Sequence, residues 1–312
     1  KDLKHYPANS DGLTTLIAQA NGVEPSQIVL GNGSADLIYF LAFFLKPKAA
    51  LLLEPSFAAY RLSLKAAKTQ IVTVFTKPKE NFLPPLKKLY EQLAKVDAVF
   101  LGNPNNPTGY LWEREVLLSL VKEFPQVVFV IDEAFIDFTE QPSLVREGLT
   151  LSNLIVLRSF TKIFNLPGLR LGYLVAQPQL SKKMQLARPP WAVNSLAVKA
   201  GRFLLQQPDF VTNSSLKIKQ AKQQFSHWLS QINWLKVYPS AANFFLVEAK
   251  NGFTSSYLAA RLLRDNLILI RDAANFVGLN SKFFRLAVLK PKQNKKLVKI
   301  LTNFSKDYEE EK

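Results

Sequence analysis

Runs of consecutive apolar residues recur along the chain as far as residue 190 and alternate with stretches of helical periodicity. Continuous apolar runs, unlike alternating ones, are typical of strands covered on both faces. The predicted strands are residues 28–30, 50–53, 70–75, 98–101, 127–131, 154–157 and 171–175. Helical patterns lie between most of them, at residues 35–45, 57–67, 86–95 and 113–124. This alternation predicts an α/β fold with a mostly parallel, doubly wound sheet.

The pattern changes after Pro189 and Pro190. Long helical stretches at 193–206 and 210–231 precede a helix near 255–264 and short apolar segments at 235–238, 244–248, 268–271 and 284–289. They predict a smaller α+β domain, with the boundary on the long helix between Gln206 and Gln231. We therefore expect an N-terminal segment over residues 1–12, a large domain over 13–208 and a small C-terminal domain over 209–312.

The composition is that of a packed protein with a sizeable core. Of 312 residues, 48% are apolar and 21% are charged, which excludes a disordered or fibrous chain. Because cysteine is absent, disulfides, thiolate metal sites and cysteine nucleophiles are excluded. As a separate expectation, the chain is given no metal site. The most apolar stretch, Leu37–Leu45, is much shorter than the roughly 18 residues of a membrane span. No membrane association is expected, and with no visible signal peptide the predicted location is cytoplasmic.

A formal net charge of +16 raises the alternative of nucleic-acid binding. The basic residues are spread along the chain, however, and the densest run, residues 289–299, is typical of the solvated face of a C-terminal helix. We expect no nucleic-acid partner and keep a basic nucleic-acid-binding protein as a distant alternative.

Polar clusters follow several predicted strands, where open α/β sheets bind ligands. Residues 31–36, Gly-Asn-Gly-Ser-Ala-Asp, open a helix whose free N–H groups suit a phosphate, although a plain turn explains them equally well. Residues 102–109, Gly-Asn-Pro-Asn-Asn-Pro-Thr-Gly, form a rigid loop that presents fixed amide donors and acceptors. This degree of constraint indicates a binding loop.

Two ionisable residues, Asp132 and Lys162, also lie at the ends of predicted strands. Asp132 ends an apolar strand, and a buried carboxylate needs a cation or hydrogen-bond donors; a helix cap or structural ion pair is the alternative. Lys162 lies among apolar residues, which lower a lysine pKa and make the amine nucleophilic. Pyridoxal phosphate is held by four kinds of group: N–H donors to its phosphate, an asparagine, a buried carboxylate and a lysine. This sequence has all four at the ends of successive strands.

The sequence resembles fold type I pyridoxal-phosphate enzymes of the class I/II aminotransferase superfamily over nearly its whole length. The resemblance is carried by Asn-Pro-Asn-Asn-Pro-Thr-Gly at 103–109 and Ser-Phe-Thr-Lys at 159–162. It implies a large domain with a seven-stranded, mostly parallel sheet, a smaller C-terminal domain, pyridoxal 5′-phosphate as the cofactor and a homodimer.

The resemblance also implies residue roles. Lys162 is similar to the lysine that bonds the cofactor's aldehyde, Asp132 to the partner of the ring nitrogen and Asn106 to the partner of the 3′ oxygen. The other implied cofactor-binding residues are Gly33, Ser34, Ala35, Ser159 and Arg170 at the phosphate, Phe57 on the ring and Tyr6, which reaches the neighbouring subunit's cofactor. The implied substrate-binding residues are Arg285, which suits the substrate carboxylate, with Asn106, Arg271 and Asn194.

Two groups within the superfamily remain open. Segments 161–173, 190–197, 237–244 and 268–276 resemble the threonine-phosphate decarboxylases, which decarboxylate L-threonine O-3-phosphate to (R)-1-amino-2-propanol O-2-phosphate for cobalamin biosynthesis. Phe135 favours the same group, because histidinol-phosphate aminotransferases, the alternative, usually have tyrosine there. Residues 8–12 depart from the usual acidic-proline pattern, and Leu289 stands near where some relatives carry a basic residue. The resemblance implies a small phosphorylated amino-acid substrate.

Overall fold

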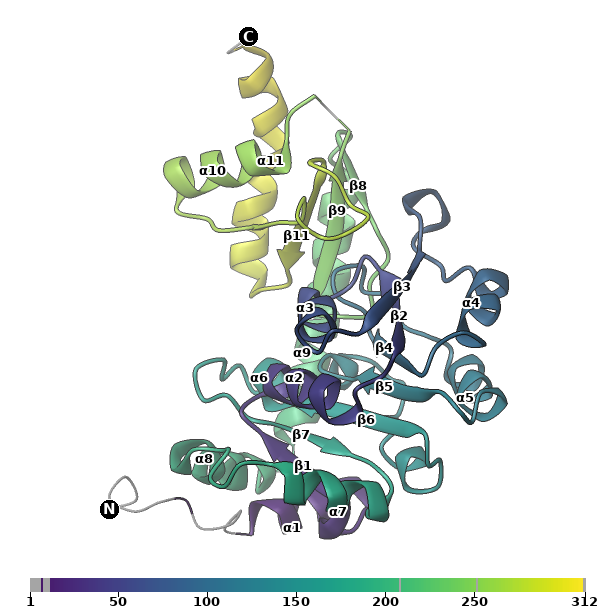
Figure 1. The fold of residues 1–312 in the computed structure, drawn as a ribbon. Helices are drawn as coiled ribbons and strands as arrows, with labels where there is room; N and C mark the ends of the chain where they lie inside the picture. The colour runs from purple at the N-terminus through teal and green to yellow at the C-terminus, as the bar shows by residue number, and fades with distance from the viewer. Residues whose placement is uncertain (1–6, 8–11, 208, 251, 311–312) are drawn as a thin grey trace.

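Two sheets organise the chain in a computed structural model that describes residue 7 and residues 12–207, 209–250 and 252–310. One sheet has seven strands in the order β1-β7-β6-β5-β4-β2-β3, and the other has four in the order β10-β11-β9-β8. Figure 1 shows the four-stranded sheet above the seven-stranded one. The predicted α/β class and seven-stranded sheet are confirmed.

The strands of the large sheet lie within two residues of their predicted ranges. They are β1 (Ile28–Gly31), β2 (Ala49–Glu54), β3 (Gln70–Phe75), β4 (Ala98–Gly102), β5 (Val128–Asp132), β6 (Leu154–Ser159) and β7 (Gly172–Val175). Four pairs, β2–β3, β2–β4, β4–β5 and β5–β6, are parallel, whereas β7 pairs antiparallel with both β1 and β6. The amino end of β7 therefore lies at the same edge as the carboxyl ends of the other six strands.

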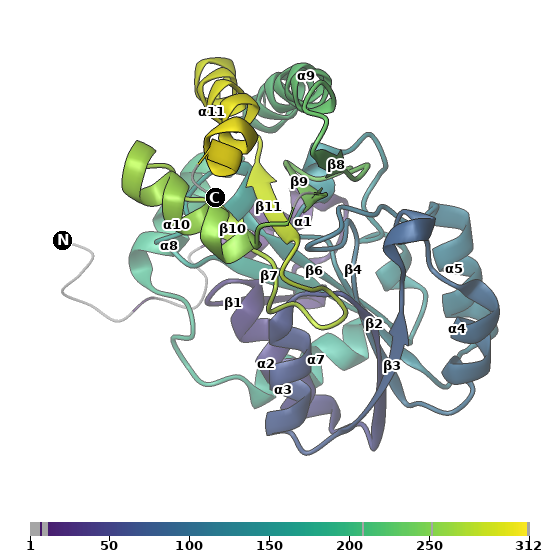
Figure 2. The same cartoon turned by 90° about the horizontal axis from the view of Figure 1, so that it is seen from above.

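Helices cover both faces of this sheet. They are α1 (Leu13–Asn21), α2 (Ser34–Leu45), α3 (Ala58–Ala66), α4 (Leu86–Leu93), α5 (Arg114–Glu123), α6 (Phe160–Ile163), α7 (Pro178–Ala187) and α8 (Ser195–Leu205). Alternate residues of β2 belong to different cores: Leu51 and Leu53 pack in the cluster that includes α1, α4 and α5, while Ala50 and Leu52 pack with α2 and α3. Figure 2 shows α2 beside α3 and α4 beside α5. Burial on both faces explains why the strands read as continuous apolar runs.

The four-stranded sheet has a separate core. Its elements are α9 (Phe210–Ser230), β8 (Leu235–Val237), β9 (Phe244–Ala249), α10 (Ser255–Asn266), β10 (Arg271–Asp272), β11 (Phe283–Ala287) and α11 (Pro291–Glu310). All three strand pairs are antiparallel. Phe225 of α9, Leu258 of α10 and Leu301 of α11 pack in one cluster with Val247 of β9. This second core supports the smaller C-terminal domain, whose boundary after residue 208 stays a prediction.

The apolar segment at residues 268–271 belongs to a strand only at its last residue, because β10 begins at Arg271. Leu267 adopts a left-handed conformation that ends α10, and the Ile268 N–H donates to the carbonyl of Leu262. Ile270 is buried in the second core. Ile268 and Ile270 therefore pack against the second core just after a helix and do not pair with a strand, while Leu269 between them is exposed. Among the described helices, none is both long and apolar enough to cross a membrane.

A buried ion-pair network joins the ends of β5 and β6. The Arg158 guanidinium contacts the carboxylates of Glu133, at 3.5 Å, and Asp137. Glu133 is fully buried and also accepts hydrogen bonds from the Ser143 hydroxyl and the Leu144 N–H. These donors hold a charge that burial alone would make unfavourable.

Replacing Arg158 by methionine is expected to leave Glu133 without its cation and to lower the free energy of unfolding by about 3–5 kcal/mol. The control is Lys219→Met, which removes an exposed ion pair with Glu140 and should leave the free energy of unfolding nearly unchanged. Denaturant unfolding of both variants measures the difference. Equal costs would contradict the structural role given to Arg158.

Candidate active site

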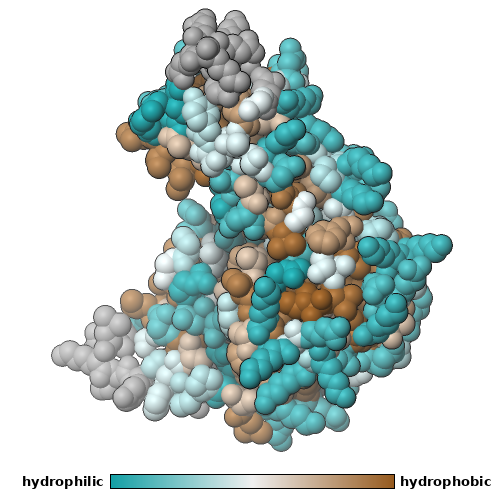
Figure 3. All heavy atoms as spheres, turned by 45° about the horizontal axis from the view of Figure 1, so that its top comes forward, coloured by the Kyte–Doolittle hydropathy of each residue, from teal (hydrophilic) through white to brown (hydrophobic). Residues whose placement is uncertain are grey.

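A cavity of about 250 Å³ lies at the edge of the large sheet where the six carboxyl ends and the amino end of β7 meet. It is lined by Ser34, Ala35, Phe57, Tyr60, Pro104, Asn106, Asp132, Ala134, Phe135, Ser159, Thr161, Lys162, Arg170 and Arg285. Among the described residues that line it, only Arg285, on β11, comes from the four-stranded sheet. The molecular surface is indented between the parts that carry the two sheets (Figure 3).

The first turn of α2 forms an anion cradle. Gly33 precedes the helix with φ +82° and, as a glycine, has no side chain with which to cap the first N–H groups of the helix. A Cβ on Gly33 would lie 2.4 Å from Nη2 of Arg170, and one on Gly172 would lie 2.7 Å from the Ser34 nitrogen. The two glycines therefore let a guanidinium and a helix N-terminus approach closely. Free N–H groups, the helix dipole and a cation together suit a phosphate.

Asp132 is the last residue of β5 and is buried in the wall of the cavity. Its Oδ2 accepts a hydrogen bond of 2.9 Å from the Tyr60 hydroxyl, and its Oδ1 accepts one of 3.1 Å from the Ala134 N–H. Burial raises the pKa of Asp132 to about 6, against the lowering by these donors and by the charge of Lys162. The carboxylate is thus fixed in orientation and poised to bind a proton donor.

Lys162 lies on the short helix α6, directly after β6. Its Nζ is 5.7 Å from the centroid of the Phe135 ring. Burial lowers the pKa of Lys162, and the charges of Arg285 and Arg170 lower it further, against the raising by Asp132. A lowered pKa favours the neutral, nucleophilic amine.

Asn106 and Arg285 meet across the cavity. A nitrogen of the Arg285 guanidinium donates to Oδ1 of Asn106, and the guanidinium lies 4.7 Å from the Phe244 ring centroid. Burial, assisted by the charge of Arg271, lowers the pKa of Arg285 to about 10. The loop that carries Asn106 is also joined to the segment between β8 and β9 of the four-stranded sheet, because the Ala241 N–H donates to the Gly109 carbonyl.

The structure brings most of the predicted site residues together. Gly33 borders the cavity, and Ser34, Ala35, Phe57, Asn106, Asp132, Ser159, Lys162, Arg170 and Arg285 line it. Arg271 lines a neighbouring cavity of about 780 Å³ that also borders Arg285. Asn194 lines neither: its Oδ1 caps α8 at the Ala197 N–H and its Nδ2 donates to the Leu169 carbonyl. Tyr6 lies outside the described residues, and the roles of all these residues stay predictions.

Tyr60 is the main residue that sequence reasoning missed. It stands three residues after Phe57, and because α3 begins at Ala58 this spacing places both side chains on the side of the helix that faces the cavity. The signal was the helical spacing. Pro104 and Thr161 also line the cavity and belong to the predicted loop 102–109 and the motif 159–162, whereas Ala134 lines it from outside these segments.

The geometry agrees with a comparison of the sequence with family models. The model for aminotransferase class I and II matches residues 2–301. The chain belongs to this family.

Within the aminotransferase class I and II family, the chain is similar to proteins of two named activities. It is 35% identical, over 97% of its length, to the adenosylcobalamin biosynthesis bifunctional protein CobDQ of Leptospira interrogans, of which it spans only 36%. It is 33% identical to the threonine-phosphate decarboxylase of Salmonella typhimurium, over 96% of this chain and 83% of that protein.

A solved family structure represents the other activity. The histidinol-phosphate aminotransferase of Clostridium acetobutylicum superposes with a TM-score of 0.91 at 30% identity, over 98% of this chain and 92% of that one. The fold of the chain is therefore also that of a histidinol-phosphate aminotransferase.

The cradle at α2 predicts the effect of Gly33→Ala. The new Cβ would displace Arg170 and strain a backbone with φ +82°, so we expect inorganic phosphate to raise the melting temperature of the wild type but not of the variant. Gly168→Ala, which adds a Cβ in open space, serves as the control and should respond like the wild type. An undiminished response in Gly33→Ala would place the anion site elsewhere.

Asp132→Asn is expected to stabilise the cofactor-free protein. Because the folded-state pKa of about 6 lies above the ordinary value of 3.8, folding favours the protonated carboxyl, and stability is lost as the pH rises through 6. At about pH 8 the variant should gain about 2–3 kcal/mol, since each pKa unit is worth about 1.4 kcal/mol. Denaturant unfolding at several pH values measures this gain, which should vanish near pH 4. If the variant is less stable than the wild type at high pH, burial does not make the ionised carboxylate of Asp132 unfavourable.

Proposed function

We propose that this protein is a pyridoxal 5′-phosphate-dependent decarboxylase that converts L-threonine O-3-phosphate to (R)-1-amino-2-propanol O-2-phosphate, a reaction of cobalamin biosynthesis. The observation that carries the proposal is the convergence of Lys162, Asp132 and Arg285 on one cavity beside the anion cradle of α2. The similarity to a threonine-phosphate decarboxylase over nearly the whole chain gives the chemistry of the substrate.

The residues at the cavity fit the cofactor. The cradle between Gly33 and Arg170, which a side chain on Gly33 would fill, suits its phosphate together with Ser34, Ala35 and Ser159. Phe57 lines the cavity and suits the face of the ring, and Asn106 suits the 3′ oxygen. The bound cofactor supplies an electron-accepting ring that takes up the electron pair released when CO₂ leaves.

The chain's own residues prepare this chemistry. The neutral amine of Lys162 would hold the cofactor through its aldehyde, and the same amine would be placed to move a proton to the substrate carbon. The carboxylate of Asp132, kept ionised by Tyr60 and Ala134, holds a proton on the ring nitrogen. Aromatic and apolar walls at Phe57 and Phe135 exclude water.

Two guanidinium groups suit a substrate that has two anionic groups, a carboxylate and a phosphate. Arg285 and Arg271 are Cα partners across β11 and β10, and their cavities adjoin. In this proposal Arg285 binds the substrate carboxylate, and Asn106 orients the Arg285 guanidinium by accepting a hydrogen bond from it. Arg271 binds the substrate phosphate. Asn194, whose amide caps α8, receives no support as a substrate ligand.

The alternative activity is histidinol-phosphate transamination, which the similarity to the aminotransferase structure supports. Phe135 favours decarboxylation within the proposal, because its ring beside Lys162 offers no hydroxyl to the 3′ oxygen. Either activity suits a homodimer, and the exposed apolar residues Tyr39, Phe43 and Leu62 on α2 and α3 support one. A cytoplasmic location and the lack of a nucleic-acid partner stay predictions from the sequence.

The proposal predicts a product that needs no co-substrate. Cofactor-loaded protein given L-threonine O-3-phosphate without an oxo acid should form aminopropanol phosphate over many turnovers, as detected by mass spectrometry. Lys162→Ala should lower turnover by several orders of magnitude, because it removes the covalent anchor and the proton carrier. If histidinol phosphate is consumed instead, and only with 2-oxoglutarate, the aminotransferase alternative is correct.

A further inference from the structure

One buried tyrosine contacts both side chains that flank the proposed cofactor ring. Tyr60 is 2% exposed, and its hydroxyl donates to Oδ2 of Asp132 at 2.9 Å. Its ring packs edge-on against Phe57, with the centroids 5.8 Å apart and the planes at 90°. The same side chain therefore links the carboxylate at the end of β5 to the aromatic residue before α3.

The position of Tyr60 is itself fixed. Its backbone N–H donates to the Phe57 carbonyl in the first turn of α3, and its own carbonyl accepts from the Ser63 hydroxyl. Its ring also packs against the ring of Phe100 on β4, with the two centroids 6.3 Å apart. Held by a helix on one side and a strand on the other, the ring cannot move without disturbing the packing of both.

We propose that Tyr60 is a positioning residue that fixes the orientation of the Asp132 carboxylate and the position of the Phe57 ring. Through these two side chains it would set the orientation and the protonation of the bound pyridine ring. The inference rests on the proposed function, because it assumes that Asp132 and Phe57 hold that ring. Tyr60 acts through these two neighbours rather than by chemistry of its own.

The charges around Asp132 give the direction of the effect. The groups that face it are Tyr60, the Ala134 N–H and Lys162, and all three lower its pKa against the larger raising by burial. The pKa of Tyr60 is itself raised well above its usual value, by burial and then by Asp132 and Glu54, so its hydroxyl remains a donor at every working pH. Without that hydroxyl the pKa of Asp132 rises above 6, and more of it is protonated near neutral pH. A protonated Asp132 holds the ring nitrogen's proton less well.

The test uses Tyr60→Phe, which removes the hydroxyl and keeps the ring. In the cofactor-loaded enzyme we expect the acidic limb of the kcat–pH profile to move to higher pH, and the visible circular dichroism of the cofactor to change. kcat should fall roughly tenfold or more with little change in KM, since a hydrogen bond to a charged group is worth at least a factor of about ten. Tyr60→Leu, which also removes the ring contact with Phe57, should additionally speed cofactor dissociation.

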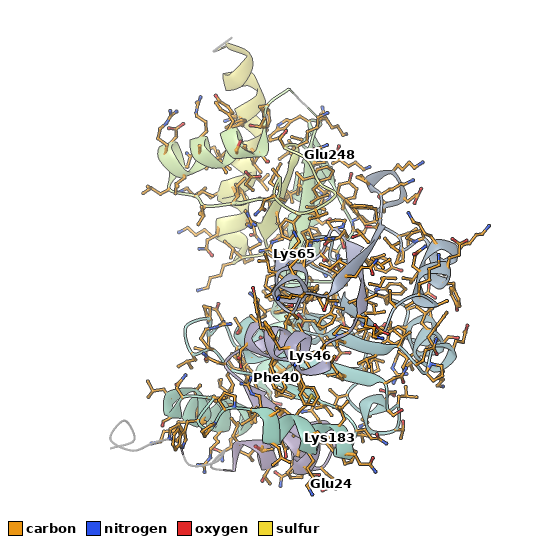
Figure 4. The ribbon with its side chains drawn as sticks, in the orientation of Figure 1. Glu24, Phe40, Lys46, Lys65, Lys183 and Glu248 are labelled. Atoms are coloured by element: carbon orange, nitrogen blue, oxygen red, sulfur yellow. The ribbon has the colours of Figure 1, made fainter. Side chains whose placement is uncertain are left out.

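A matched control separates positioning from stability. Tyr238 is also buried and donates to a carboxylate, Glu248, but Tyr238 directly follows β8 and Glu248 lies on β9 of the four-stranded sheet. Figure 4 labels Glu248 there and Lys65 on α3, in different parts of the molecule. Tyr238→Phe should lower thermal stability and leave the pH profile and the dichroism unchanged.

The outcomes are distinct. A wild type that binds pyridoxal phosphate, beside a Tyr60→Phe variant with the same pH profile, dichroism and kcat, overturns the role of Tyr60 alone. A wild type that does not bind pyridoxal phosphate overturns the proposed function, and this inference with it.

Discussion

Strand β7 lies between β1 and β6 and runs against both, with Gly172 opposite Gly31 on one side and Ser159 on the other. This reversal returns the chain to the edge where the parallel strands end, so that Arg170, just before β7, faces the N-terminus of α2. Gly172 permits the contact, because any side chain would meet the Ser34 nitrogen. The anion cradle therefore depends on one antiparallel strand within a mostly parallel sheet, and the lysine, carboxylate and asparagine are placed relative to that cradle.

The site is assembled against the preferences of its own ionisable groups. Burial raises the pKa of Asp132 and lowers those of Lys162 and Arg285, so each charged form is less favourable here than in water. Hydrogen bonds from Tyr60 and Ala134 offset part of this cost at Asp132. The nearby Glu133 is instead balanced by Arg158 and two further donors, as expected of a carboxylate with a structural role. Adjacent acids in one sequence thus differ in purpose because they differ in partners.

Much of this was predictable from the sequence. The strands of the large sheet are continuous apolar runs because both faces are covered, and polar residues at their ends mark the binding edge. The direction of β7 was not predictable, since the residue pattern of a strand does not encode its direction. The apolar segment at 268–271 forms no strand before Arg271, because Ile268 and Ile270 pack in the second core just after α10 instead of pairing with a strand. Tyr60 was missed because its role arises from a contact with Asp132, 72 residues away in the sequence.

The central claim is that this edge of the sheet holds pyridoxal phosphate through Lys162. Borohydride reduction of the cofactor-loaded protein, followed by proteolysis and peptide mass spectrometry, tests it most directly, because reduction makes the bond between the lysine and the cofactor permanent. The account predicts a single modified peptide that contains Lys162. Modification of another lysine, or a protein that carries no label after loading, would contradict it.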